Sequence, residues 1–523
     1  PGRSVEPADP DVSGSVAIGV LPFTVTGEEE MWREGLATLL ATSLHGAAGL
    51  QAREPEYVLK LWESEFEGAP PTRERVRTAA RRLAIDWIVT GSMATANGRL
   101  RLTAEAWNPG AGRRAGPVTV EARRESLFSA VDHLTVELLR DGVIADDESA
   151  LPIELSRVTT SSPRALEAYL EGERAWRSAR LRNAAEAFSR AVRLDSTFAL
   201  ARYRLAIAQY WVGTGDPQRH LRSAVRNAHR LHDREATLAR GWLALQEGNI
   251  QAGLDSLRAL THRSPEFGEG WLRLGDALLH NGGRLLVPMS EFRSAMHQAI
   301  RTNPLAAEPY WHLLEDAFFR EDSVEARHLS EAYRRVDPYS PACIGYMTAY
   351  QLAWGDPESR AAAVDRLPSL SGEVRGPLNC ALSVLDRAPP LEPALDLVAD
   401  ELESSRRPEV ERRMARPNRI RLAIRAGAID EARRLLRLYY GEDEDARRLA
   451  AANILLLDVL AYPHPTSARE AERILAEAPS PEERFWMAAA ALADGRMTDV
   501  DSGIAALHQS ARSLPEETAA QAR

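Results

Sequence analysis

The chain has 523 residues, 44% of them hydrophobic and 27% charged, and its formal net charge is −10. This length exceeds what one hydrophobic core usually supports, so we expect at least two structural units, and the composition is that of a folded chain. The negative charge offers no attraction to nucleic acid or to an anionic membrane surface, and we predict neither as a direct partner. The two cysteines are too few for a disulfide framework or a cysteine metal site.

The first 15 residues are polar and rich in Pro and Gly, which is typical of a linker. The chain begins at Pro1 rather than at Met, so we expect a segment upstream, such as a signal peptide or a membrane anchor. Within the chain, no apolar run reaches the roughly 18 residues that a membrane-spanning helix needs. Any attachment to a membrane therefore requires an anchor outside this sequence.

Residues 16–145 have the pattern of an α/β domain. The run "VAIGVLPF" is rich in branched residues and predicts a buried strand that Pro22 closes. Asn97-Gly98 between two alternating runs predicts a tight β-hairpin. We expect, in chain order, a strand at 16–23, a helix at 31–44, a strand at 51–54, helices at 57–66 and 72–83 (the second with Thr72 as its N-cap), strands at 87–94, 99–108 and 117–122, and a helix at 127–139.

This first region resembles the TolB amino-terminal-like domain, which is related to the CsgG and FlgO groups. Members carry a strand ending in V-L-P-F, a helix with a Gly-Leu pair, and Y-V-L-x-G-S-V before a hairpin. The matching residues are Val20, Leu21, Pro22, Phe23, Gly35, Leu36, Ile88, Val89, Gly91, Ser92, Leu100 and Leu102, whereas Trp87, Thr90 and Met93 depart from the pattern. The resemblance implies a fold and supplies no catalytic residue. We interpret the Pro and Gly positions as requirements of backbone geometry.

Helix-sized segments recur at intervals near 34 residues from 162 to 340, after a predicted linker at 146–161. The stretch Asn183–Ala206 contains the end of one helix pair and the start of the next. Trp271, Leu274 and Gly275 form the W-x2-L-G opening of a tetratricopeptide (TPR) helix, so this region resembles TPR repeats. Prolines interrupt the register in residues 341–523, which we interpret as degenerate TPR-like helical repeats. The expected fold class is an α/β N-terminal domain plus an all-α TPR-type helical solenoid.

The sequence contains no recognisable catalytic motif. A G-x-x-x-x-G-K-[ST] phosphate loop is absent, as are a kinase signature set, G-x-S-x-G and H-E-x-x-H. His229 and His232 are spaced as two ligands on one helix face, but no third ligand is evident, so surface histidines are favoured. We therefore predict no enzyme activity, no catalytic residues, no metal site and no cofactor.

Partner binding is expected in the groove of the solenoid, which the first helix of each repeat lines. Aromatic side chains mixed with a few charges suit the capture of a protein or peptide. The candidate groove residues are Tyr169, Glu173, Trp176, Tyr203, Tyr210, Asp276, Trp311 and Glu315. For Trp176 and Tyr203 a place in the core between repeats is an equal alternative. The charged candidates favour the groove, because charges are rarely buried unpaired.

The combination resembles the extracytoplasmic part of bacterial membrane serine/threonine kinases, cyclases or winged-helix regulators. We therefore expect a non-catalytic sensor or interaction module that binds a protein or peptide, in the periplasm or at the cell surface. The alternative is a secreted or periplasmic scaffold that assembles with copies of itself, because solenoids offer long surfaces for head-to-tail contact. The sequence does not identify the ligand.

Overall fold

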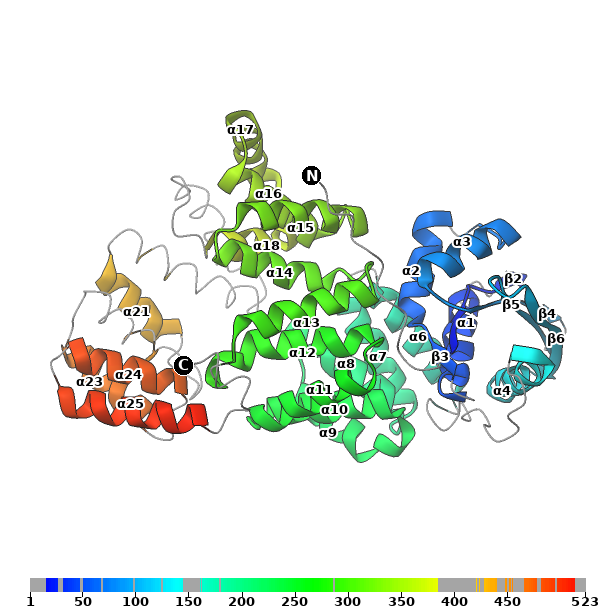
Figure 1. The fold of residues 1–523 in the computed structure, drawn as a ribbon, viewed down its shortest axis with the longest axis horizontal. Helices are drawn as coiled ribbons and strands as arrows, with labels where there is room; N and C mark the ends of the chain where they lie inside the picture. The colour runs from blue at the N-terminus through cyan, green and yellow to red at the C-terminus, as the bar shows by residue number, and fades with distance from the viewer. Residues whose placement is uncertain are drawn as a thin grey trace. The chain divides into compact units, whose positions relative to one another are not determined.

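The computed structural model describes residues 16–143, 160–383 and parts of 420–512 (Figure 1). The first two ranges are interrupted at 27–31, 48–49, 67–68, 97–98, 124–125, 161, 178–179 and 286, and the last one comprises 420, 423, 428–439, 447–448, 451–452, 454, 465–476, 481–493 and 496–512. The chain divides into two compact units, Pro1–Leu243 and Ala244–Arg523. The linkers predicted at 1–15 and over most of 146–161 lie outside the described residues.

Unit 1 begins with a six-stranded mixed sheet in the order β3-β1-β4-β5-β6, with β2 paired to β4. The strands are β1 (Val16–Val20), β2 (Thr24–Thr26), β3 (Leu50–Ala52), β4 (Trp87–Ala96), β5 (Arg99–Asn108) and β6 (Arg113–Arg123). β1 runs parallel to β3 and β4, and the last three strands are antiparallel. Ala96 pairs with Arg99, the register of the predicted hairpin, whose turn residues are not described. The short β2 was not predicted.

Four helices pack around this sheet: α1 (Trp32–Leu44), α2 (Pro55–Phe66), α3 (Arg73–Leu83) and α4 (Leu127–Leu138). α1 and α4 contact each other and the strands, whereas α2 contacts β1 and α3 contacts β4. Thr72 caps α3, because its side chain accepts a hydrogen bond from the Arg75 amide, as predicted. The predicted elements occur in the predicted order, except that β1 ends at Val20 and β2 is added, and the α/β fold class is confirmed.

Phe23 explains why the V-L-P-F motif and the G-S pair of β4 occur together in the sheet. Its ring is 1% exposed and lies over Gly91 of β4, where a Cβ atom would be only 2.4 Å from the ring. Gly91 is therefore required by a side chain packing on the strand. The sequence analysis attributed this glycine to backbone geometry alone, and that explanation was incomplete.

The rest of unit 1 consists of paired helices: α6 (Pro163–Arg177), α7 (Leu181–Leu194), α8 (Ala199–Val212), α9 (Pro217–Arg226) and the first part of α10 (Asp233–Gln246). α6 packs on α7, α7 on α8, and α8 on α9. Phe188 is fully buried, and a Cβ atom at Gly172 would lie 2.5 Å from its ring. Gly172 thus lets α6 approach α7 while the large Phe188 ring fills the space between the two helices.

The α/β region and the first helix pairs belong to the same compact unit. Glu34 of α1 forms ion pairs with Arg174 and Arg177 of α6. Beside them, a Cβ atom at Gly35 would lie 2.5 Å from the Leu170 side chain. The domain boundaries predicted from the sequence stay predictions, because these contacts join the two regions without locating the boundary between them.

Unit 2 continues the helix pairs with α11 (Ile250–Arg263), α12 (Gly268–Asn281), α13 (Met289–Thr302), α14 (Glu308–Phe319), α15 (Ser323–Val336), α16 (Pro341–Trp354), α17 (Pro357–Arg366) and α18 (Gly372–Ser383). Each helix from α11 to α16 packs on the next one along the chain, and α18 packs on α16. In addition, α12 contacts α14, so first helices of successive repeats lie side by side. This arrangement is that of a TPR-type solenoid.

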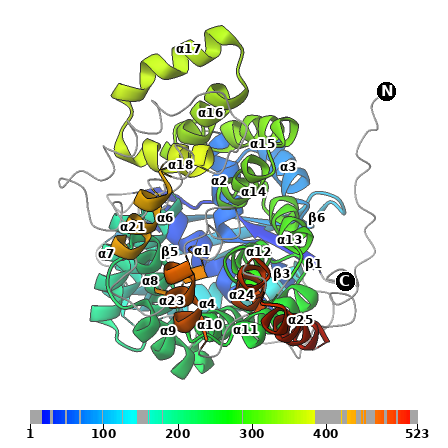
Figure 2. The same ribbon diagram turned by 90° about the vertical axis from the view of Figure 1, so that its left-hand side faces the viewer.

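Helices persist toward the C-terminus as α21 (Ile429–Tyr439), α23 (Pro465–Leu475), α24 (Pro481–Ala493) and α25 (Met497–Arg512). α24 and α25 lie side by side in Figure 2 and contact each other closely. A small core of apolar residues joins Leu435 of α21, Leu475 of α23 and Ala490 of α24. Among the described residues, none of the helices has the length and apolar content required to cross a bilayer.

The packing at Gly172 yields a prediction. Gly172→Ala should lower the free energy of unfolding by about 1–3 kcal/mol, because the rigid Phe188 ring has to move. Gly275→Ala is the matched control, because its Cβ would meet the flexible end of Met296 and alanine favours a helix over glycine by about 0.5–1 kcal/mol. Urea unfolding of both variants measures the difference. Equal stability of the two variants would contradict this account of the packing.

A second prediction concerns His45, whose ring packs edge-on against that of His232 at 5.8 Å. Burial, the positive charge of Arg234 and the nearby His232 lower the pKa of His45 to about 3. Between about pH 6.5 and 3, His45 is therefore protonated in the unfolded chain but neutral in the folded chain. Because the unfolded state binds more protons, the stability of unit 1 falls as the pH drops from about 6.5 toward 3.

His45→Gln should flatten this slope, which can reach about 1.4 kcal/mol per pH unit at most. Urea unfolding at several pH values between 4.5 and 7 measures it. His133→Gln serves as the control, because that histidine lies in the same region with its side chain 63% exposed. An identical slope in His45→Gln and the wild type would show that His45 does not cause the acid sensitivity.

Candidate functional site

The predicted groove residues of unit 1 are mostly buried. Tyr169, Glu173 and Trp176 lie on α6, and each is less than a tenth exposed. Tyr203 on α8 is 1% exposed and fills the core between repeats, which was the alternative considered for it. Tyr210, two turns further along α8, is 42% exposed and is accessible to a partner. The role of these residues in binding stays a prediction, and Tyr210 is the one of them best placed for it.

Tyr210 belongs to an aromatic cluster on the first helices α8 and α10. Its ring lies edge-on to Trp242 at 5.6 Å and to Trp211 at 6.3 Å. Trp242 also packs edge-on against the buried Tyr203 at 6.4 Å. The cluster therefore has a buried base and a partly exposed edge. Aromatic rings fixed in this way supply contact area to a partner at a low cost in conformational entropy.

Glu173 is the acid of a buried ion pair. Its Oε1 lies 2.9 Å from Nε of Arg204 on α8. Burial raises the pKa of Glu173, and the charge of Arg204 and a hydrogen bond from Tyr169 oppose that shift. Because Arg remains charged, the pair is internally neutralised and links the first helices of two successive repeats.

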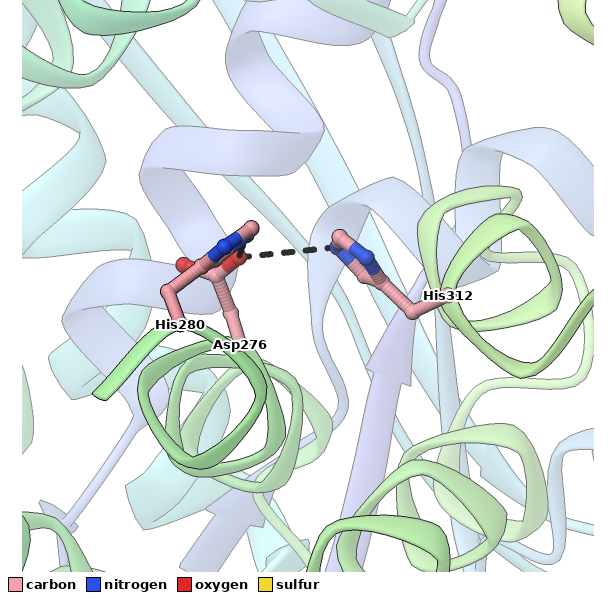
Figure 3. A group of neighbouring side chains, drawn as sticks. All are labelled: Asp276, His280 and His312. Carbon is pink, nitrogen blue, oxygen red and sulfur yellow. Dashed lines mark ion pairs between the residues drawn. The ribbon is translucent and has the colours of Figure 1, made fainter. Parts of the chain in front are cut away.

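In unit 2 the structure brings two predicted residues together through a histidine that the sequence analysis missed. His312 of α14 faces Asp276 of α12 (Figure 3). On its other side it lies near Glu315 of its own helix. Its Nε2 is 3.5 Å from Asp276 Oδ1, and its Nδ1 is 3.6 Å from Glu315 Oε2. His280, one turn after Asp276, places its Nε2 3.3 Å from the same Oδ1 atom. Tyr346 of α16 donates a hydrogen bond of 2.8 Å to Glu315.

This cluster combines buried and accessible groups. The side chain of His312 is 5% exposed, whereas that of His280 is 49% exposed. Burial alone would raise the pKa of Asp276, but the interaction with His280 and the charge of His312 nearby lower it to about 2. Burial works against the proton on His312, yet Glu315 and Asp276 raise its pKa. The site therefore favours positive charge next to the Asp276 carboxylate.

The third predicted residue of unit 2, Trp311, points elsewhere. Its indole Nε1 donates a hydrogen bond to the hydroxyl of Tyr333 on α15, which is buried and also bonds Ser340. Trp311 thus joins the two helices of its own repeat, and the structure does not place it in the histidine cluster. Its predicted contact with a partner stays untested.

Parts of the two clusters could be found in the sequence. Asp276 and His280 are four residues apart on one predicted helix, which is a spacing that places two ligands on one face. His312 follows Asp276 by about one repeat, so repeat stacking brings them close. Trp242 lies in a helix whose contact with α8 only the structure reveals. Tyr346 likewise depends on the packing of a third repeat.

Neither a family model nor a curated protein matches the chain. Solved structures similar to it include PilF of Pseudomonas aeruginosa, at 13% identity, 40% coverage of this chain, 95% coverage of that one and a TM-score of 0.28. The TPR protein YrrB, described as having an unusual peptide-binding site, is 15% identical over 34% of this chain and 87% of YrrB, with a TM-score of 0.21. The human IFIT1 dimer with PPP-AAAA is 14% identical over 68% of this chain and 88% of IFIT1, with a TM-score of 0.35. At such TM-scores we draw no functional conclusion from them, and the repeat architecture rests on the helix packing described above.

Proposed function

We propose that this chain is a non-catalytic module that binds a protein or peptide along the first helices of its TPR-type repeats. The observation that carries this proposal is the aromatic cluster of Tyr210, Trp211 and Trp242. Tyr210 is exposed enough to contact a partner, and the rings around it hold it in place. An aromatic side chain with an exposed edge on a rigid scaffold is the usual anchor of a peptide-binding surface.

The finer proposal is that the module is the extracytoplasmic part of a bacterial membrane signalling protein, with a TolB-like domain ahead of the repeats. The V-L-P-F strand and the G-S pair of that family support it, because Phe23 packs directly on Gly91 here. The ion pairs of Glu34 with Arg174 and Arg177 give the domain a direct contact with the first repeat helix. The gene sequence upstream of Pro1 tests this placement, since a membrane anchor must be encoded there.

The binding proposal leads to a prediction on Tyr210. Peptides selected by the full chain from a random phage-displayed library should bind Tyr210→Ala about tenfold more weakly, which corresponds to about 1.4 kcal/mol. Fluorescence anisotropy with the selected peptides measures the loss. Tyr339→Ala is the control, because this tyrosine is 88% exposed and lies outside the cluster, so its removal should leave the affinity unchanged. Failure to select any peptide, or equal affinity of all three proteins, would refute the proposed surface.

A further inference from the structure

The cluster between α12 and α14 has the donor atoms of a metal site. Asp276 offers a carboxylate oxygen, and His280 and His312 each offer an imidazole nitrogen, with the three atoms within 4.8 Å of one another. Two imidazoles and one carboxylate are a common ligand set for zinc and related divalent transition metals. Figure 3 shows the three side chains converging from two helices on a common point.

The spacing of these atoms fits one shared ion better than it fits hydrogen bonds. Metal–ligand distances of about 2.0–2.2 Å in a tetrahedral site place neighbouring ligand atoms about 3.3–3.6 Å apart. The two contacts of Asp276 Oδ1, with His280 at 3.3 Å and His312 at 3.5 Å, have these lengths. A direct N–H···O bond is normally 2.7–3.2 Å long. Asp276 Oδ1 is buried and has no hydrogen bond of ordinary geometry among the described residues.

The surroundings of His312 match those of a metal-bound histidine. A ligating imidazole usually offers its second nitrogen to a carboxylate, which fixes the orientation of the ring. Here Nε2 of His312 lies toward Asp276, and Nδ1 lies 3.6 Å from Glu315 Oε2, which is an ion-pair distance and longer than a hydrogen bond. Tyr346 then donates a hydrogen bond to Glu315 and holds that carboxylate in position. With Asp276 on α12, three successive first helices (α12, α14 and α16) thus contribute to the site.

Comparison with other repeats shows what is unusual about Asp276. Glu173 follows Gly172 as Asp276 follows Gly275, and it is paired with the guanidinium of Arg204. Asp316 occupies the same place after Trp311 and Leu314, and it is paired with two arginines, Arg293 at 3.2 Å and Arg320 at 2.8 Å.

The residue four positions after Asp316 is Arg320, which pairs with it. The residue four positions after Asp276 is His280 instead. The nearest arginine in α12 is Arg273, and it forms its own ion pairs with Glu269 and Glu308. A permanent positive charge directly on the carboxylate is therefore replaced by two imidazoles. Because imidazoles can be neutral, a bound cation can balance the negative charge of the Asp276 carboxylate.

We propose that Asp276, His280 and His312 bind one divalent transition-metal ion of the zinc class, with Glu315 and Tyr346 as its supporting partners. The half-exposed His280 lies on the open side of the site, where a fourth ligand from water or from a bound molecule completes a tetrahedron. The ion links α12 to α14 and stiffens the wall formed by the first helices. This reverses the expectation of no metal site that the sequence alone suggested, and it does not depend on the proposed peptide binding.

The test is a titration of the chelator-treated full chain with Zn²⁺, measured by calorimetry in competition with a chelating dye. One ion per chain should bind with a Kd of about 1 µM or lower. Co²⁺ in its place should show the visible absorption of a tetrahedral nitrogen–oxygen site. His280→Ala should weaken binding at least about tenfold, and Glu315→Gln about 10–100-fold, because it removes the charge that orients His312.

His297→Ala is the matched control, because His297 is 44% exposed and its Nε2 lies 3.9 Å from Glu325 in the same unit, whose carboxylate also pairs with Arg320. Its substitution should leave Zn²⁺ affinity unchanged. His280→Asn replaces His280→Ala if circular dichroism shows that the alanine variant is not folded. Binding that is equal in the His280 variant, the His297 variant and the wild type, or no binding at all, would show that the cluster contains internal ion pairs only.

Discussion

The close approach of the two helices in each pair is the constraint on which the rest of the solenoid depends. At Gly172 the absence of a Cβ atom lets the Phe188 ring of α7 lie directly against α6, and at Gly275 the same position receives Met296. One pair covers only part of its apolar surface, so the next pair must stack on it, as α7 does on α8. This stacking sets the distance between successive first helices. The contact of His312 with Asp276 and the hydrogen bond of Tyr346 to Glu315 both follow from that distance.

Because stacking fixes the first helices, they carry different chemistry along the chain without any change of fold. In unit 1 the first helices present a cluster of aromatic rings around Tyr210. In unit 2 they present carboxylates and imidazoles around Asp276. An aromatic edge suits apolar parts of a partner, whereas the polar cluster suits an ion. A repeat scaffold separates such surfaces by position alone.

The sequence predicted the elements far better than the roles of individual side chains. The branched run of β1 and the Thr72 cap are local signals that predicted their elements, and the 34-residue periodicity predicted the paired helices. Whether Tyr203 faces the groove or the core depends on the curvature of the stack, which no local pattern encodes. The histidine cluster was missed for a related reason, because His312 acquires a role only when α14 lies beside α12. A site built from residues of different repeats can be predicted only once the alignment of the repeats with one another is known.

The acidic position after the first-helix glycine shows how one place in a repeat acquires different roles. Burying a carboxylate is costly unless a positive group accompanies it, so each repeat that keeps the acid must supply one. Arg204 does this for Glu173 within the protein, and the resulting pair has no need of a further ion. Asp276 instead faces His280 and His312, whose charge depends on a proton. A cation from solution can take the place of that proton, and for this reason the site in α12 differs in kind from those of its neighbours.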